Sequence, residues 1–357
     1  MSSRALSPQL KAWYPSSVAW LDPPRKGHMA IHIGRRKFLA TLGGAASWPL
    51  AARAQQPNGR VRHLGLLLPG LPEASLGKAT LDRLRELGYI EGRNIILETR
   101  WADGKVERLN ELAAELAGLK LDAIIAFTTP AAIAARKATT TIPVIFLYVG
   151  DPVGAGVVPS LARPGGNTTG ISLLATELAA KRLEILLEIA PKISRVAMLW
   201  NDTNPGMVLR ARESQDTAPK LGVTIESVGV HDLINFYSAF ARIESSGIDA
   251  LLTLVDPFTS QHRKLIVDFA ARRRLPAIYE SREFVESGGL ICYGPNSVAI
   301  EHRAAEYVDK IFRGAKPADL PVEQPTKFEM LINMKTVKAL SLSIPQSVML
   351  RADRVIE

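Results

Sequence analysis

The sequence predicts an α/β protein built from two doubly wound, Rossmann-like lobes. Three observations support this fold class. The chain has 357 residues, which is enough for about two α/β domains. Hydrophobic residues make up 47% and charged residues 22%, as in chains that bury a core. From Arg60 onwards, short apolar runs alternate with amphipathic stretches, and this alternation occurs in both halves.

In the first half, the apolar runs are typical of parallel strands that are covered on both faces. The stretches between them carry leucines at helical spacing. In 76–87, for example, Leu81, Leu84 and Leu87 form one stripe, and Gly88 ends the helix. The predicted order is strand 61–69, helix 76–87, strand 94–100, helix 107–119, strand 122–127, helix 130–138 and strand 142–149.

The second half continues with the same alternation. Because the connections are short, we expect parallel strands with right-handed crossovers. The predicted order is helix 177–189, strand 195–200, helix 206–221, strand 223–228, helix 236–245, strand 249–255, helix 261–274 and strand 276–279.

The two lobes are expected to be joined by a three-strand hinge. We place crossings near 167–174 and 289–296, and a third in the proline-containing tail beyond Lys316. Lobe 1 would then hold 60–172 plus about 295–322, and lobe 2 would hold 173–294 plus about 323–357.

The N-terminal segment predicts export. Arg35-Arg36-Lys37 precedes a short apolar stretch that ends in Ala52-Arg53-Ala54, the layout of a signal peptide cleaved after Ala54. We expect 1–54 to be an extension plus this signal, with the true start at Met29. The paired arginines fit either twin-arginine or Sec export. The mature protein is expected in the periplasm, soluble, and without a lipid anchor because no cysteine follows the cleavage site.

The net charge of +9 does not indicate nucleic-acid binding. Residues 1–54 hold eight Lys/Arg and one acid, Asp22, which leaves 36 basic and 34 acidic residues in the rest of the chain. A nearly neutral body lacks the broad basic surface that phosphate binding requires.

Signatures of catalysis, cofactors and metals are missing from the sequence. It has no G-x-S-x-G elbow, H-E-x-x-H helix, Walker A loop or G-x-G-x-x-G fingerprint. One cysteine, Cys292, allows no disulfide within the chain. The histidines of the mature chain, His63, His231, His262 and His302, show no metal-ligand spacing. We therefore expect a protein without catalytic activity, cofactor or metal.

Polar residues follow the predicted strands at their carboxyl ends, where open α/β sheets bind ligands. Thr128 and Thr129 follow strand 122–127, with Thr129 a suitable N-cap and Pro130 a suitable first helical residue. The free N–H groups of that turn could bind a carboxylate, although a plain capped helix explains the segment equally well.

Further strand ends carry acids and amides from both halves of the chain. Each could be a helix cap or a turn residue, but together they would place anionic groups on one rim. A carboxylate-binding helix end facing such acids suits a zwitterion such as an amino acid. The candidate ligand-binding residues are Thr128, Thr129, Asp151, Asn201, Asp256, Tyr279 and Glu280.

Several segments of the chain resemble the substrate-binding protein family of ABC transporters. That family is related to proteins that bind tryptophan and other aromatic amino acids. The resemblance covers about 60–357 and is carried by 72–75, 87–94, 100–102, 139–144, 150–153, 163–170 and 324–329. It implies a type I periplasmic-binding-protein fold of the Venus-flytrap kind. It also implies a ligand carboxylate at Thr128-Thr129 and an ammonium group held by second-lobe acids, a role that Asp256 fits.

The resemblance implies the periplasmic solute-binding component of an ABC importer. Its partners would be a small polar ligand, an amino acid or related carboxylate, and an ABC permease in the inner membrane. We expect a monomer with no nucleic-acid partner. A ligand-sensing module that feeds a receptor, or a periplasmic hydrolase that uses the same cleft, are the alternatives.

Overall fold

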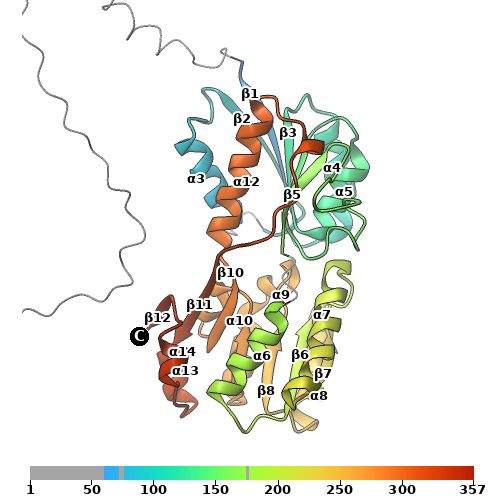
Figure 1. The fold of residues 1–357 in the computed structure, drawn as a ribbon. Helices are drawn as coiled ribbons and strands as arrows, with labels where there is room; N and C mark the ends of the chain where they lie inside the picture. The colour runs from blue at the N-terminus through green and yellow to red at the C-terminus, as the bar shows by residue number, and fades with distance from the viewer. Residues whose placement is uncertain (1–59, 72–75, 174–176) are drawn as a thin grey trace, which may run out of the picture. The chain divides into compact units, whose positions relative to one another are not determined.

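The computed structural model describes residues 60–71, 76–173 and 177–357, which form two β-sheets with helices on their faces (Figure 1). The predicted N-terminal extension, start and signal peptide lie outside these residues, as does the 72–75 motif. Within the described ranges, no helix is both long and apolar enough to cross a bilayer.

The first sheet has five strands in the order β2-β1-β3-β4-β5, and all its neighbouring strands are parallel. Its strands are β1 (Arg62–Leu68), β2 (Ile95–Trp101), β3 (Ala123–Phe127), β4 (Val144–Val149) and β5 (Thr168–Ser172). The helical segments between them are α3 (Lys78–Glu86), η2 (Val106–Arg108), α4 (Leu109–Ala117) and α5 (Thr129–Ala138).

Alternating residues of these strands enter two different cores, because successive side chains of a strand point to opposite faces. Ile125 and Phe127 of β3 pack in the core beneath α3 and α12 (Ser297–Phe312). Ile124 and Ala126 pack in the core beneath α4 and α5. β3 is buried on both faces, and this explains why it reads as a continuous apolar run.

The second sheet has seven strands in the order β12-β11-β10-β9-β8-β6-β7. They are β6 (Arg195–Trp200), β7 (Thr224–Gly229), β8 (Ala250–Thr253), β9 (Ala277–Tyr279), β10 (Ile291–Pro295), β11 (Phe328–Asn333) and β12 (Arg354–Ile356).

Two helical layers cover this second sheet. One core lies beneath α6 (Glu177–Ile189), α7 (Pro205–Thr217), α13 (Met334–Ala339) and α14 (Gln346–Met349). The other lies beneath α8 (Leu233–Ser245), α10 (Arg263–Arg272) and α11 (Arg282–Glu286). The remaining short helices are η3 (Ala218–Leu221), α9 (Pro257–Gln261) and η4 (Pro317–Asp319).

The eight strands predicted by residue range are confirmed as β1–β4 and β6–β9. One pair differs from the expected parallel arrangement, because β11 runs antiparallel to β10. The chain leaves β10 towards the first sheet, where it forms α12, and then returns into β11 (Figure 1). It re-enters the second sheet at the end where β10 left it, so the two strands run in opposite directions.

The chain passes between the sheets after β5, between β10 and α12, and between α12 and β11. The returning segment is tied to the edge of the first sheet, where the Ser172 N–H donates to the Glu323 carbonyl at 2.8 Å. The α12 helix, which packs beside α3 on the first sheet, had no counterpart among the helices predicted from the sequence.

Candidate functional site

A cavity of about 1160 Å³ lies where the carboxyl ends of strands from both sheets meet. Its walls come from α3, α12 and the ends of β1, β3 and β4 on one side. On the other side they come from α6, α7 and the segments that follow β8 and β9. We call this cavity the cleft.

The N-terminus of α5 presents free hydrogen-bond donors to the cleft. The structure makes Thr128 the N-cap and Thr129 the first helical residue, one position earlier than the sequence predicted. The first N–H groups of any helix lack a partner within the helix. The Thr128 side chain adds a further donor: the residue is 8% exposed, and its Oγ1 has no hydrogen-bond partner among the described residues.

Thr128 also has an unusual backbone, with φ at +80°. This region is costly for a β-branched residue and is found mostly where function demands a particular geometry. The conformation fixes the position of the hydroxyl at the start of α5.

The start of α7 lies directly against this helix end from the second sheet. A Cβ atom on Gly206 would lie 2.2 Å from Thr129 Oγ1, and one on Gly150 would lie 2.4 Å from the Gly206 carbonyl oxygen. Only residues without a side chain permit so close an approach. The two glycines therefore let the α5 and α7 N-termini meet at the bottom of the cleft.

Asp256 organises the loops of the second lobe at the cleft. One carboxylate oxygen accepts the Thr259 N–H at 2.9 Å and so caps α9, and the Thr259 hydroxyl accepts the Asp256 N–H in return. The other oxygen accepts amide N–H groups from Asn201 at 2.7 Å and Asn204 at 3.1 Å. The Thr259 hydroxyl also lies 3.2 Å from the first oxygen, so polar groups of its own lobe hold both oxygens of the carboxylate in place.

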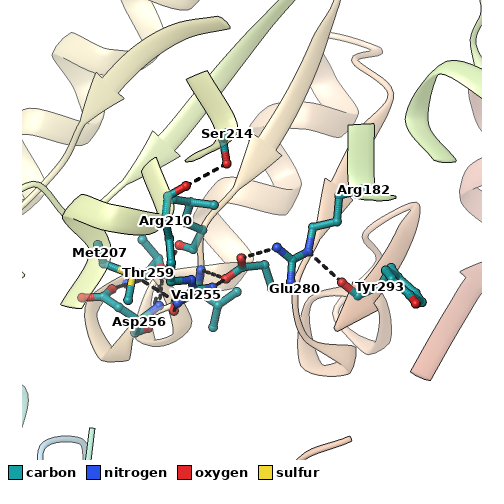
Figure 2. Close-up of polar contacts among 10 residues, drawn as sticks. Arg182, Met207, Arg210, Ser214, Val255, Asp256, Thr259, Glu280 and Tyr293 are labelled. Carbon is teal, nitrogen blue, oxygen red and sulfur yellow. Dashed lines mark hydrogen bonds and ion pairs between the residues drawn. The ribbon is translucent and has the colours of Figure 1, made fainter. Parts of the chain in front are cut away.

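A row of charges, Arg182–Glu280–Arg210, forms the deeper wall of the second lobe (Figure 2). Glu280 pairs with Arg182 at 2.7 Å, with Arg210, and with the Val255 N–H at 2.7 Å. The Arg182 Nε donates to the Tyr293 carbonyl at 2.7 Å, which fixes the guanidinium to β10.

Burial lowers the pKa of Arg182 and of Arg210. The pKa of an arginine side chain is ordinarily so far above neutral that both arginines keep their charge at neutral pH. Two guanidiniums share one carboxylate in this row, so it presents surplus positive charge and N–H donors to the cleft.

Tyr148 and Glu301 form a second buried polar group, on the first-lobe side. The Tyr148 hydroxyl donates to Glu301 at 3.0 Å. Glu301 also accepts the N–H groups of Gly77 and Thr80, at 3.2 and 3.1 Å, at the start of α3. Burial raises the pKa of Glu301. This carboxylate joins α12 to the N-terminus of α3 along the cleft wall.

Four of the seven candidate residues line the cleft: Thr128, Thr129, Asp256 and Glu280. Asn201 contacts this group by donating a hydrogen bond from its side-chain amide to Asp256. Asp151 does not line the cleft; its carboxylate accepts the N–H groups of Val153 and Gly154 in its own turn, at 3.2 and 2.8 Å. Tyr279 is fully buried behind the wall, with its ring stacked on Phe284 at 4.8 Å.

Four residues of the site were not predicted from the sequence: Arg182, Arg210, Tyr148 and Glu301. The two arginines lie on helices whose exposed faces also carry charges, so the sequence contains no signal that separates them from surface residues. Tyr148 stands at an irregularity between Leu147 and Val149 with φ at +57°, which a strand pattern does not reveal.

A smaller cavity of about 240 Å³ adjoins the cleft. It is lined mainly by apolar side chains from η2, α4 and α5 and from the segments around Pro205 and Phe258. We call it the side cavity. Asn204 and Asp256 line both cavities.

No group of three or more His, Cys, Asp or Glu side chains within the described ranges could hold a metal ion. Cys292 is buried in the second sheet, and burial raises the pKa of its thiol. The features present at the site are therefore hydrogen-bond donors, charges and apolar surface.

Known proteins are similar to this chain in both sequence and fold. A curated tyrosine-binding protein from Clostridioides difficile is 29% identical over 275 residues, covering 77% of this chain and 78% of the relative. A Streptococcus pneumoniae ABC domain solved in complex with L-Trp is 26% identical, with a TM-score of 0.78. The match covers 83% of this chain and all of that chain.

A third similar protein is a substrate-binding protein with adhesive properties from Clostridium difficile, solved in a ligand-free, open form. It is 26% identical, with a TM-score of 0.63, and the match covers 83% of this chain and 99% of that chain.

The family model for ABC transporter substrate binding proteins matches residues 71–356, nearly all of the described chain. The two α/β lobes with parallel strands at their centres have the type I periplasmic-binding-protein fold. On this match and this fold, the chain belongs to the ABC transporter substrate binding protein family.

Proposed function

We propose that this protein is the periplasmic solute-binding component of an ABC importer. It binds an amino acid or related carboxylate in the cleft between its lobes and delivers it unchanged to an inner-membrane permease. The apolar stretch after Arg35-Arg36-Lys37 supports export before this role. The relatives that bind tyrosine and L-Trp support the class of ligand.

The observation that carries the proposal is the pairing of two donor groups across one cleft. The α5 N-terminus with the unpartnered Thr128 hydroxyl belongs to the first lobe, and the Arg182–Glu280–Arg210 row belongs to the second. Arg210 lies close to the first lobe, since its Cδ is 3.3 Å from where a Gly150 Cβ would be. A carboxylate bound between α5 and Arg210 would satisfy donors from both lobes at once.

The second lobe also offers an acceptor for an ammonium group. The Asp256 carboxylate lines both cavities, and Asn201 holds it in place. In this proposal Asp151 shapes the turn beside Gly150, and Tyr279 supports the wall from behind.

Binding would close the lobes and exclude water, which strengthens each polar contact in the lower dielectric. A ligand that contacts both lobes binds the closed form better and shifts the population towards it. The ligand-free, open structure of a similar protein supports such a movement.

The test is native mass spectrometry of the freshly purified mature protein, followed by denaturation to release and identify any small molecule. We expect a carboxylate, amino acids foremost, that is recovered chemically unchanged after prolonged incubation with the protein. Failure to bind any amino acid or related carboxylate in subsequent calorimetry, or conversion of a bound metabolite, would contradict the proposal.

A further inference from the structure

We propose that Asn296 and Glu329 form a brace at the hinge, which holds the lobes in the arrangement where the α5 and α7 N-termini meet and so sets the affinity for the ligand from outside the cleft. We call the contact between these two side chains the hinge brace. This inference rests on the proposed function and adds to it a pair of positioning residues. It is carried by the place of the contact in the fold and by the burial of Glu329.

The hinge brace lies where two of the crossings between the lobes run side by side (Figure 1). Strand β10 ends at Pro295, which is paired with Phe328 at the start of β11. One residue further along, the Asn296 N–H donates to the Lys327 carbonyl at 3.0 Å. A rotation of one lobe against the other must therefore take up its changes of backbone angle next to Asn296.

The Asn296 side chain connects the two lobes. Its Oδ1 accepts the Ala299 N–H at 2.8 Å and so caps α12, the helix that packs on the first sheet. Its Nδ2 donates to Glu329 Oε2 at 3.0 Å, and Glu329 lies on β11 of the second sheet. Because the two ends of one side chain are held by different lobes, a movement of α12 away from β11 must break one of these bonds.

Glu329 is placed where the loss of this donor is costly. The residue is 7% exposed, and Arg282 Nη1 lies 3.6 Å from the same oxygen that accepts the Asn296 amide. A buried carboxylate that loses a hydrogen-bond donor is destabilised, because water does not readily replace the donor. The hinge brace therefore favours the lobe arrangement in which it is formed.

The hinge brace acts on ligand affinity only through the lobes, because neither Asn296 nor Glu329 is among the described residues that line the cleft or the side cavity. The strand that leads to Asn296 is nevertheless tied to the cleft wall, since Arg182 Nε donates to the Tyr293 carbonyl at 2.7 Å. If fewer molecules adopt the arrangement that binds ligand, the apparent dissociation constant rises by the same factor.

Asn296→Asp breaks the hinge brace and keeps the helix cap, because aspartate is as good an N-cap as asparagine but has no N–H to donate to Glu329. It also sets two carboxylates against each other, which pushes α12 and β11 apart. In the double variant Asn296→Asp/Glu329→Gln the donor and the acceptor change places, so the hydrogen bond can form again.

Asn333→Asp is the matched control. Asn333 caps α13, and its Nδ2 donates to the Val285 carbonyl at 3.3 Å. The same substitution therefore removes the same kind of donor from the same kind of cap, but both partners belong to the second lobe.

The experiment compares the full mature protein with the three variants at about pH 8, where neighbouring carboxylates stay charged and do not share a proton. Thermal unfolding shows that each variant is folded. Small-angle X-ray scattering without ligand measures the radius of gyration, and calorimetry measures the affinity for L-tyrosine and L-tryptophan, the amino acids bound by the similar proteins. Asn296→Asp should have a larger radius of gyration and bind about tenfold more weakly. The double variant and Asn333→Asp should keep the radius and bind within about threefold of the parent.

The alternative results separate the two proposals. If Asn296→Asp has the radius of gyration of the parent, or if the double variant behaves like the single one, the hinge brace is wrong and the proposed function stands. The same holds if Asn333→Asp lowers affinity as much as Asn296→Asp does. If neither these amino acids nor any other carboxylate binds the parent protein, the proposed function fails, and scattering without ligand still decides for or against the hinge brace.

Discussion

Glu280 and Arg182 form an ion pair at 2.7 Å in which the side chains are only 3% and 5% exposed. The pair joins the end of β9 to α6, and Arg182 in turn reaches the Tyr293 carbonyl of β10 (Figure 2). Charges buried this deeply are held in place by their partners, because an unpaired charge in the interior is costly.

Replacing Glu280 should therefore destabilise the protein strongly. In Glu280→Gln, Arg182 and Arg210 remain buried without their shared carboxylate. We expect a loss of about 3–5 kcal/mol in the free energy of unfolding, measured by urea denaturation. Glu286→Gln is the control: Glu286 is 41% exposed and pairs with Arg354 at the surface, so its loss should cost less than about 1 kcal/mol. If both substitutions lowered the free energy of unfolding equally, burial would not be what makes the Glu280 ion pairs important for stability.

Thr128 should show a conflict between stability and binding. Its φ of +80° costs about 1–3 kcal/mol for a β-branched residue, and glycine adopts this angle without strain. In Thr128→Gly we expect an equal or higher melting temperature, together with about tenfold weaker ligand binding because the buried hydroxyl is lost. Thr128→Ser keeps the hydroxyl and should keep the affinity. Unchanged binding in Thr128→Gly would remove this hydroxyl from the site.

Gly206 should control how closely the lobes approach. The Cβ of Gly206→Ala would lie 2.2 Å from Thr129 Oγ1, so α5 and α7 must separate. We expect ligand affinity to fall about tenfold or more, while the free energy of unfolding changes little because moving the lobes apart relieves the clash.

Small-angle X-ray scattering of Gly206→Ala with saturating ligand should give a larger radius of gyration than the parent protein. The control is Gly118→Ala, at the end of α4, where the nearest atoms to an added Cβ are 3.3 Å or more away. A Gly206→Ala protein that binds as tightly as the parent would show that this contact does not limit closure.

Glu323 should contribute stability that is lost in acid. Its carboxylate makes a two-bond ion pair with Arg303, at 2.6 Å for each contact, and the guanidinium lowers the pKa of Glu323 below its usual value of 4.5. The folded protein therefore holds the charged form more strongly than the unfolded chain does. This stabilisation is complete above the unfolded pKa and disappears as the pH falls through the folded pKa.

We expect Glu323→Gln to lower stability at about pH 7 and to reduce the difference in stability between about pH 7 and pH 3. Urea denaturation at each pH measures both quantities. Glu111→Gln, at an exposed position in the first turn of α4, is the control. If both variants lose stability in acid as the parent does, the Arg303 pair contributes nothing to acid sensitivity.

The sequence predicted best the strands that form continuous apolar runs. Strand β3 and positions 196–199 of β6 are buried, and each is an unbroken apolar run that is visible without any structural knowledge. Some strands without such a run were not predicted. β5 reads Thr-Thr-Gly-Ile-Ser, which has no strand pattern, and it is recognised as a strand only by its pairing with β4.

The residues of the candidate site divide in the same way, into those that a sequence pattern marks and those that it does not. Thr128, Asp256 and Glu280 were found because they follow the predicted strands, and position relative to an apolar run is readable from sequence. Arg182 and Arg210 lie within helices, where the sequence does not tell which polar residue turns inward. Their role depends on a carboxylate about 70 to 100 residues further along the chain, a relationship that only the fold creates.

The position of α12 has a consequence for any attempt to isolate one half of the molecule. A fragment ending at Ser172 would include all five strands of the first sheet and α3 but not α12, so the core that holds Ile125, Phe127 and Leu147 would lose the part of its cover that α12 provides. Such a piece should aggregate when expressed by itself. A separately folding first lobe would need α12 grafted back, for example through a short linker replacing the whole of the second lobe.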